Sequence, residues 1–486
     1  MSDTRPNVVL IMADQLRADC LGCYGNTVIE TEFIDFLASE GTVFENAYSP
    51  SPSCVPARTC LMTGMNQWNT GIMGMGGGQG KSTDGFLHTL PGELAKAGYH
   101  TQGIGKMHFS PQRSLCGFHH TVIDESMRKE EKHFVSDYHA WFEQNKTGDY
   151  GPVDHGIPFN SWMTRPFQAP EFLHPTNWTV NQAINFLEKR DPTKPFFLKV
   201  SFARPHSPYD PPQWYYDKYK EKEPTEPYMG DWATVHDDIQ AGKNPDAWHG
   251  RIPIEKVMDG RRGYYGSIHH VDHQIGRLMQ FMSRYMKNEM QNTLFIFTSD
   301  HGDMLGDHFM WRKTYAYEGS ARIPLIVKLP TKMKTKQVAV NDKPVTLYDI
   351  MPTVLEATGV QIPKTVDGLS LLPLTQDRDV PWRDVVHGEH STCYSQEEEM
   401  QFVTDGKYKY IWFPRTGREQ FFRLTEDRSE SKDLICDPDY SDKREEYKGK
   451  LIEILRARNA GLVDDEGLVV QTKPIISPEY AKRVGV

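Results

Sequence analysis

Cysteine is scarce in this chain and follows no paired pattern. The seven cysteines are an odd number without regular spacing, which argues against a disulfide framework. The closest pair, Cys20 and Cys23, has no second pair that would complete a structural zinc site. We therefore expect neither disulfides nor structural zinc to hold the fold.

Long apolar runs are also missing. A membrane-spanning helix needs about 20 consecutive apolar residues, and the sequence contains no such run. The first residues, MSDTRP, lead straight into a short apolar stretch, without the basic segment and apolar core of a signal peptide. We expect no membrane contact and a cytoplasmic protein, or a periplasmic or secreted one if the chain has been trimmed.

The chain has no excess of positive charge. Its formal net charge is −10, which argues against a nucleic-acid partner. A small anionic substrate stays possible, because lysine, arginine and a metal ion can set the local field inside a pocket.

Short apolar runs alternate with amphipathic stretches over the first three quarters of the chain. Residues 7–13, 101–105, 195–203 and 292–298 are typical of buried parallel strands. Residues 31–40, 90–97, 179–189, 255–286 and 347–358 are typical of helices. This alternation predicts an α/β fold, a doubly wound sheet flanked by helices.

The pattern changes near residue 375. Short strands at 385–387, 401–404, 408–413 and 420–424, followed by a charged helix at 444–458, predict a small antiparallel sheet with one helix. We predict a catalytic α/β domain over 1–375 and an α+β subdomain over 376–486. Irregular insertions at about 125–170 and 209–254 are expected to shape the substrate pocket.

The stretch CVPAR, Cys54 to Arg58, is the first candidate for chemistry. Pro56 suits the first turn of a helix, which places Cys54 where free backbone N–H groups favour an anion. Arg58 adds a fixed positive charge one turn later. These residues describe an electropositive pocket with a reactive sulfur, or a buried structural cysteine beside a helix-capping proline.

Polar residues follow four of the predicted strands. Asp14 with Gln15, Lys106 with His108, His206, and Asp300 with His301 each come after an apolar run. The carboxyl ends of parallel strands meet at one edge of a sheet, where such folds bind their ligands. We therefore expect these side chains to share one site.

With these residues in place, the chain resembles a known family. The blocks NVVLIMADQ, CVPAR, GKMHF, ARPHSPY, TSDHGDMLGDH and WRKTYAYEGSARIP match, in order, motifs of the type I sulfatases of the alkaline phosphatase superfamily. The match covers residues 7–330. A weaker one, DGKYKYI and GREQFFRLTEDRSESKDL, resembles the C-terminal sheet of that family. The resemblance implies an alkaline-phosphatase-like sheet.

The resemblance also implies the cofactors. In this family the motif cysteine, here Cys54, is oxidised to formylglycine by a separate maturation enzyme. The hydrated aldehyde attacks sulfur, a covalent sulfo-enzyme forms, and the remaining hydroxyl expels sulfate. One divalent cation would be bound by the set Asp14, Gln15, Cys54, Asp300 and His301. Oxygen donors favour Ca²⁺, while the imidazole leaves Mg²⁺, Mn²⁺ or Zn²⁺ open.

The remaining roles are carried over in the same way. Arg58 would hold the hydrate, and Lys106 and Lys313 would neutralise sulfate oxygens. His108 would take the proton of the hydrate as the ester collapses, and His206 would be a general acid near the leaving oxygen. The alternatives are solvated surface lysines at 106 and 313, and a turn-capping histidine at 206.

The metal-binding blocks depart from the commonest family pattern. Many sulfatases carry Asp-Asp and Asp-Asn where this chain has Asp14-Gln15 and Asp300-His301. The variant resembles choline sulfatases, some glycan sulfatases and formylglycine-dependent phosphonate monoester hydrolases. We therefore expect a hydrolase of small carbohydrate or aryl sulfates, with a phosphonate monoester hydrolase or phosphodiesterase as the alternative. A non-catalytic sulfated-glycan binding protein is a remote third. Neither the substrate nor the oligomeric state is predicted.

Overall fold

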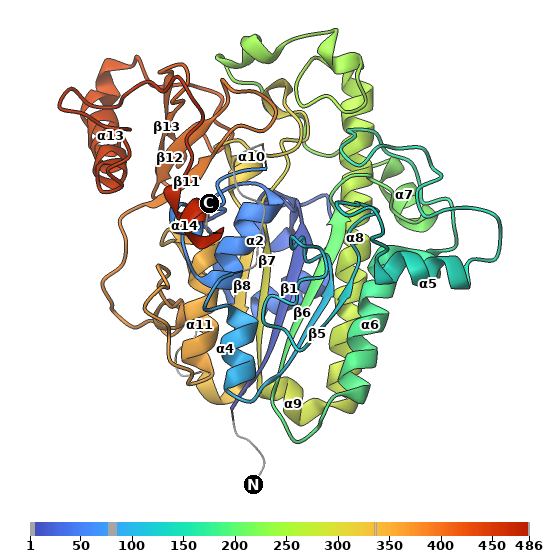
Figure 1. Cartoon of the computed structure of the whole chain (residues 1–486). Coiled ribbons are helices and arrows are strands. Elements are labelled where there is room, and N and C mark those ends of the chain that lie inside the picture. Colours follow the sequence, from blue (N-terminus) through green and yellow to red (C-terminus); the bar gives the residue numbers. More distant parts are fainter. Residues whose placement is uncertain (1–4, 76–84, 335, 337, 485–486) are drawn as a thin grey trace.

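A large mixed sheet forms the centre of the protein. The computed structural model describes residues 5–75, 85–334, 336 and 338–484. Within them, eight strands lie in the order β5-β4-β6-β1-β7-β8-β2-β9 (Figure 1). The first five strands in this order, β5 to β7, run parallel to one another, whereas β8 runs antiparallel to both β7 and β2. Their bounds are β1 Asn7–Asp14, β2 Thr42–Phe44, β4 His100–Gly105, β5 His120–Ile123, β6 Phe196–Pro205, β7 Thr293–Ser299, β8 Leu325–Lys328 and β9 Val340–Asn341.

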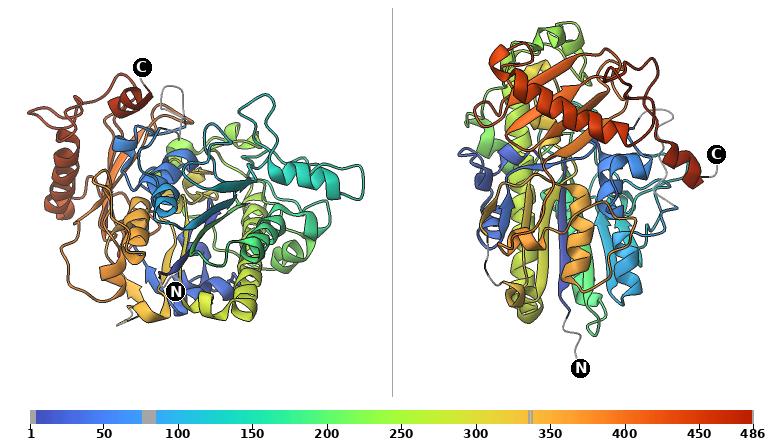
Figure 2. Two further views of the ribbon diagram at one scale, coloured as in Figure 1. Left: turned by 60° about the horizontal axis from the view of Figure 1, so that its bottom comes forward. Right: turned by 90° about the vertical axis from the view of Figure 1, so that its left-hand side faces the viewer.

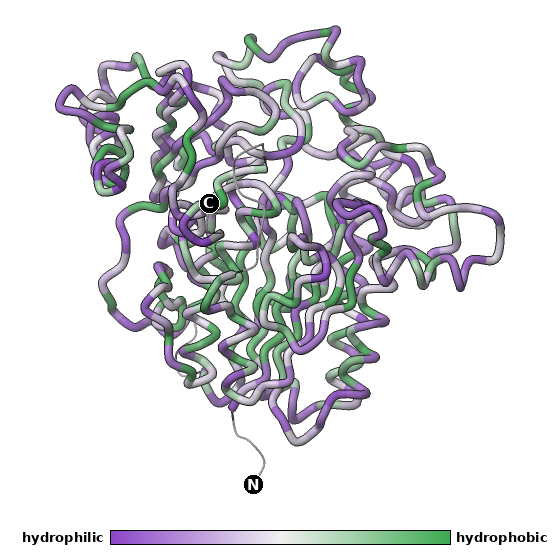
Figure 3. Tube along the Cα trace, in the orientation of Figure 1, coloured by the Kyte–Doolittle hydropathy of each residue, from purple (hydrophilic) through white to green (hydrophobic). Residues whose placement is uncertain are grey.

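Both faces of the sheet are buried. On β1, Val9 and Ile11 belong to one hydrophobic core, and Val8 and Leu10 belong to the other. Alternating side chains of a strand point to opposite faces, so a strand covered on both sides must be apolar at every position. Figure 3 shows this as apolar colouring through the sheet.

Helices cover each core separately. The core on the Val9 side is closed by α1 (Glu32–Ser39), α6 (Pro175–Lys189) and the long α8 (Ile254–Tyr285). The core on the Val8 side is closed by α2 (Cys54–Thr63), α4 (Leu90–Lys96) and α11 (Ile350–Ala357). The predicted doubly wound architecture is confirmed, and the stretch 255–286 is a single helix. No helix in the described ranges has the length and apolarity that crossing a bilayer would require.

The parallel strands end at one edge of the sheet. In Figure 1 they rise from the end of the molecule that carries the N-terminus and finish near the start of α2, beneath the C-terminal sheet. This geometry places the residues that follow β1, β4, β6 and β7 close together.

The two insertions contain helices that we did not predict. The first holds α5 (Asp137–Asn145) and the second holds α7 (Gln213–Lys220). On each helix only two side chains are buried, Tyr138 and Phe142 on α5, and Tyr215 and Tyr219 on α7. Aromatic residues on short polar helices give a weak apolar stripe, so the sequence pattern concealed both helices.

A second sheet lies above the strand ends. Its four antiparallel strands are β11 (Val386–His390), β12 (Met400–Thr404), β13 (Tyr408–Trp412) and β14 (Glu419–Arg423), in that order. Helix α13 (Ser441–Arg456) packs on the outer face, as both views of Figure 2 show. These elements match the predicted antiparallel sheet with one helix. The boundary between residues 375 and 376 stays our proposal.

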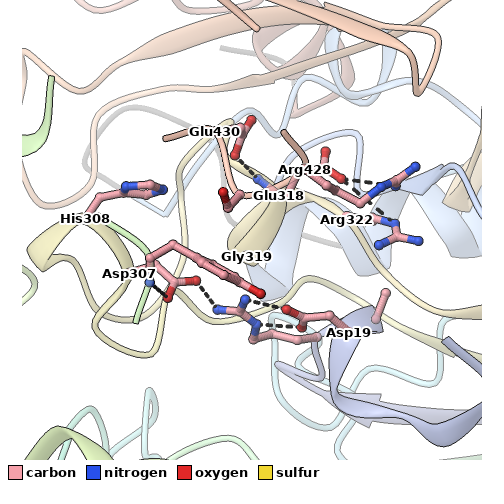
Figure 4. A pocket seen from close by; sticks show the side chains of 12 residues that line it. Asp19, Asp307, His308, Glu318, Gly319, Arg322, Arg428 and Glu430 are labelled. Atoms are coloured by element: carbon pink, nitrogen blue, oxygen red, sulfur yellow. Dashed lines mark hydrogen bonds and ion pairs between the residues drawn. The ribbon is translucent and has the colours of Figure 1, made fainter. Parts of the chain in front are cut away.

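Charged residues join the second sheet to the first. A cavity of about 100 Å³ lies between them, lined by Arg17, Asp19, Asp307, Glu318, Arg322, Arg428 and Glu430 among others (Figure 4). Around it Arg17 pairs with Asp19 and Asp307, and Arg428 pairs with Glu318. The cavity lining holds three arginines and four carboxylates, so its charges nearly cancel, which suits a structural contact between the sheets.

Lys409 on β13 is the most buried cation of this contact. Its side chain is fully buried, and Nζ lies 2.8 Å from Glu318 Oε1 and 2.7 Å from Glu430 Oε1. The ammonium also donates to the backbone oxygen of Ala316, at 2.8 Å. One lysine therefore offsets two buried carboxylates from two different parts of the chain.

We expect Lys409→Met to destabilise the protein by about 3–5 kcal/mol, because it leaves the buried Glu430 without its ion-pair partner and Glu318 with the partly exposed Arg428 and with Arg322 only. The urea midpoint of unfolding measures the loss. Lys407→Met, at an exposed position two residues away, is the control and should shift the midpoint little. Equal shifts in the two variants would contradict this account of the contact.

Candidate active site

Cys54 is the first residue of α2. Ser53 before it is extended, and Pro56 occupies the first turn, as the sequence predicted. The whole helix is buried, and Cys54 itself is only 1% exposed. The start of α2 therefore points its sulfur into the protein, at the edge where the parallel strands end.

Three side chains surround the Cys54 sulfur. Sγ lies 3.2 Å from Nε2 of His301 and 3.7 Å from Oδ1 of Asp14. Asp14 ends β1, while Asp300 and His301 follow β7, the neighbouring strand. One ligand atom from each of Asp14, Cys54, Asp300 and His301 can be chosen so that all four lie within 4.8 Å of one another.

The donor types at this cluster suit a divalent cation. Nδ1 of His301 lies 2.8 Å from the backbone oxygen of Gly302, and a proton on Nδ1 would donate to it. The Nε2 lone pair would then face the two carboxylates, each 3.7 Å away. A histidine oriented through its second nitrogen is typical of metal ligands.

Arg58 is buried beneath the same carboxylates. Its Nε donates to Asp300 Oδ2 at 2.7 Å, and Nη2 lies 3.3 Å from Asp14 Oδ2. Nη1 donates to the backbone oxygen of Lys106 at 2.5 Å and to Ser201 Oγ at 2.9 Å. Our expectation that Arg58 holds the hydrated nucleophile stays a prediction; in the structure its hydrogen bonds go to groups at the strand ends.

Both carboxylates are held in the ionised form. Burial acts to raise the pKa of Asp14, but Lys106, His206 and Arg58 hold it well below its ordinary value. Burial acts in the same direction on Asp300, and Arg58 outweighs it, so this pKa is also lowered. Two anionic oxygen donors therefore stand ready for a cation.

Gln15 and Lys313 connect the cluster to His206. Lys313 Nζ donates to Gln15 Oε1 at 2.7 Å and lies 2.7 Å from Nε2 of His206. Nε2 of Gln15 is 2.5 Å from Asp303 Oδ2. Lys313 and His206 are buried beside the cluster, so Lys313 is not a solvated surface lysine.

Lys106 and His108 follow β4 on the other side of the cluster. The Lys106 ammonium forms an ion pair with Asp14 Oδ2. Both ring nitrogens of the buried His108 lack a hydrogen-bond partner among the described residues. Burial, together with the charges of Arg128 and Lys106, holds the pKa of His108 well below its ordinary value. His108 is therefore a neutral, unpartnered base at the site.

Two of these residues adopt the left-handed backbone conformation. Gln15 has a φ of 66° and His108 a φ of 58°. Residues other than glycine occupy this region at a cost in free energy, and such positions cluster at functional sites.

Sequence reasoning missed Ser201 and Asp303 as neighbours of the site. Ser201 lies inside β6, where a lone serine in an apolar strand gives no signal. Asp303 does have a signal, since it stands in the quoted TSDHGD block. It accepts hydrogen bonds from Gln15 and Tyr209, at 2.5 and 2.6 Å. His390, at the end of β11, lies 2.7 Å from Ser53 Oγ, so the C-terminal sheet reaches the start of α2.

Two family models match the chain. The model described as Sulfatase matches residues 6–360, and the one described as N-sulphoglucosamine sulphohydrolase, C-terminal, matches residues 306–457. The chain is 44% identical over 476 residues to an arylsulfatase of Clostridium perfringens, covering 96% of this chain and 97% of that protein. It is 26% identical over 450 residues to a choline-sulfatase of Rhizobium meliloti, covering 90% of this chain and 84% of that protein.

Solved structures share the fold. One, in complex with its substrate D-glucosamine-2-N,6-O-disulfate, superposes with a TM-score of 0.74 at 22% identity and covers 93% of this chain and 98% of that chain. The phosphonate monoester hydrolase of Agrobacterium radiobacter also reaches a TM-score of 0.74, at 23% identity, covering 96% of this chain and 100% of that chain. At these identities the likeness concerns the fold.

We expect Asp300→Ala to lose bound divalent metal, because a site for a hard cation depends on its carboxylates. Elemental analysis of the purified protein measures this loss independently of activity. Asp342→Ala, which removes an exposed carboxylate, is the control and should keep its metal. Since Arg58 also loses a partner in Asp300→Ala, the thermal midpoint should confirm that the variant is folded. Full metal content in folded Asp300→Ala would refute this site.

Proposed function

Since the chain belongs to the sulfatase family and is a sulfuric ester hydrolase, we propose that the cluster around Cys54 is its catalytic centre. We also propose that its substrate is a small carbohydrate or aryl sulfate. The observation that carries the proposal is the meeting of Cys54 with the ends of β1 and β7. Sγ of Cys54 lies 3.2 Å from His301 Nε2 and 3.7 Å from Asp14 Oδ1. A sulfur without a function would not require buried carboxylates beside it.

Asp14, Gln15, Asp300 and His301 would hold one divalent cation next to the residue derived from Cys54. The sulfur marks the place of the oxygens that replace it in formylglycine. The cation would supply positive charge for the sulfate group, and the hydrated aldehyde of formylglycine would supply the nucleophile. We propose calcium, because three of the four side chains offer oxygen and the site is anionic.

Lys106 and Lys313 would bind the sulfate group from two sides. Lys106 approaches from the end of β4, next to Asp14, and Lys313 approaches from the loop that contacts Gln15. Fixed ammonium groups in a buried site stabilise negative charge that grows on oxygen in the transition state. Arg58 positions Asp14 and Asp300 from below.

The proton for the leaving oxygen would come from the pair Lys313 and His206. Burial, and after it the charges of Lys313 and Lys106, hold the pKa of His206 well below its ordinary value. His206 is therefore neutral before substrate binds, with its Nδ1 2.8 Å from the backbone oxygen of Ser207 and Nε2 facing the Lys313 ammonium. Nζ of Lys313 would pass a proton to Nε2 of His206, and Nε2 would pass it on to the leaving oxygen, which leaves Lys313 neutral.

His108 would accept a proton on the opposite side of the site. It is buried, and its neutral ring has no hydrogen-bond partner within the described residues. A base of this kind suits the hydroxyl that must lose its proton when sulfate is released.

A phosphonate monoester hydrolase or phosphodiesterase is the second candidate. Structures named as phosphonate monoester hydrolases share the fold. A protein from Trinickia caryophylli that is 27% identical to this chain is named a multifunctional alkaline phosphatase superfamily protein. The 44% identity to an arylsulfatase favours sulfate. The rates of the matured enzyme on matched nitrophenyl sulfate and nitrophenyl phosphonate esters decide between the two.

The proposal requires a partner that matures Cys54. None of the seven cysteines is in a disulfide, and in the folded chain Cys54 is almost fully buried. The formylglycine-generating enzyme would meet the chain where it folds, which we propose to be the cytoplasm.

Cys54→Ala should keep the fold but abolish turnover, because no other residue supplies the nucleophile. Peptide mass spectrometry of active protein should show the sulfur of Cys54 replaced by a carbonyl oxygen. Cys436→Ala, at an exposed cysteine, is the control and should retain activity. Full activity with an unmodified thiol at position 54 would refute the proposed formylglycine mechanism.

His206→Ala should slow a sugar or alkyl sulfate far more than nitrophenyl sulfate. An alkoxide needs a proton as the S–O bond breaks, worth roughly 10²–10⁴-fold, whereas a nitrophenolate leaves without one. The two values of kcat/KM are compared between variant and wild type. Lys106→Ala, which removes charge stabilisation, should slow both substrates about equally. Equal slowing by His206→Ala would make His206 a binding residue.

A further inference from the structure

Arg312, directly before Lys313 in the chain, is a buried cation without a counter-charge among the described residues. Its side chain is 8% exposed, and the guanidinium nitrogens Nε and Nη2 have no hydrogen-bond partner within the described residues. No described carboxylate forms an ion pair with it. Buried guanidinium groups are costly unless they are paired, so this one can take a partner that the described residues do not supply.

The backbone of Arg312 is held firmly even though its side chain is not. Its N–H donates to Asp303 Oδ1 at 2.8 Å, and its carbonyl accepts from the N–H of Met304 at 2.7 Å. The φ angle of 70° places it in the left-handed region. The loop thus fixes the residue in a backbone conformation that costs free energy, and such conformations are common at functional positions.

An aromatic wall stands beside the guanidinium. Cζ of Arg312 lies 5.2 Å from the ring centroid of Tyr394, within cation–π range. Trp248 stacks on Tyr394 with centroids 6.3 Å apart and an interplanar angle of 13°, and Tyr315 lies 6.4 Å from Tyr394. Tyr394 follows β11 and Trp248 belongs to the second insertion, so three distant segments meet around Arg312.

This corner adjoins the proposed sulfate site. Lys313, the next residue, contacts Gln15 and His206 there. The charges of Lys313 and Arg312 both act on the pKa of Cys393, the residue before Tyr394, which is consistent with one shared region. A ring held with its reacting sulfate at Lys313 can therefore present a second substituent to Arg312.

We propose that Arg312, against the wall formed by Tyr394 and Trp248, binds a second anionic group of the substrate, either a carboxylate or a further sulfate. The inference rests on the proposed sulfatase function and narrows its substrate class to ring compounds with two negative groups. A planar guanidinium with two free nitrogens suits the paired oxygens of such a group, which would satisfy both donors at once. The aromatic side chains would pack against the ring that carries it.

The test uses four substrates. They are 4-nitrophenyl sulfate, two derivatives of it that carry a ring carboxylate at different positions, and a derivative that carries a ring sulfonate. For each anionic substrate, kcat/KM is divided by that of 4-nitrophenyl sulfate, in wild type and in Arg312→Gln. Differences in leaving-group reactivity cancel between the two enzymes. We expect the ratio to fall about 10- to 100-fold in the variant for at least one anionic substrate, since hydrogen bonds to a charged group are lost. If the ratio falls for a carboxylated substrate, the second anionic group is a carboxylate; if it falls for the sulfonated substrate, the group is a further sulfate.

Arg312→Lys keeps the charge without the fork and should give an intermediate ratio, and it serves in place of Arg312→Gln if that variant does not fold. Arg251→Gln, which removes an exposed arginine paired with Asp237, is the control and should leave all ratios unchanged. Unchanged ratios in both Arg312 variants, with 4-nitrophenyl sulfate still hydrolysed, would overturn the subsite alone. If matured wild type hydrolysed none of the four sulfate esters, the proposed function would fail and the subsite with it.

Discussion

The guanidinium of Arg58 is the contact on which the site depends. Through it α2 is tied to the ends of four strands: to Asp14 of β1, the carbonyl after β4, Ser201 of β6 and Asp300 after β7. Removing such a charge from water is costly, and these hydrogen bonds and ion pairs at the strand ends offset the cost. Cys54 can therefore lie where it does only when all four strands are in register.

The C-terminal sheet completes this arrangement from above. Lys409 fixes it to the loop that carries Glu318, and β11 then brings His390 to Ser53 and Tyr394 to Arg312. In the mechanism that we propose, the strand ends supply the groups that handle sulfate, whereas the second sheet and the second insertion face the rest of the substrate. Reaction and selectivity are thus built from different parts of the chain, as is common for sites at the edge of an α/β sheet.

The strands and the residues at their ends could be predicted because both signals are local. A buried parallel strand is apolar throughout, and a polar pair such as Asp14-Gln15 stands out directly after it. The motif around Cys54 added the family and its fold. Helices α5 and α7 were missed because their apolar faces consist of two aromatic residues each. The partners of Arg58 and the isolation of Arg312 were beyond prediction, because they depend on which segments fold back onto a given residue.

The burial of Cys54 sets an order of events for the life of the molecule. At 1% exposure, and at the head of a helix that is buried along its whole length, the thiol is out of reach of any other enzyme once the chain has folded. If Cys54 is matured as we propose, the modifying enzyme would have to act on the nascent or unfolded chain, in competition with folding. A chain that folded first would stay in its inactive form. The share of active molecules in a cell would then be set by the rate of modification and the rate of folding. Over-production beyond the capacity of the modifying enzyme would accumulate folded protein with an unmodified, inactive site.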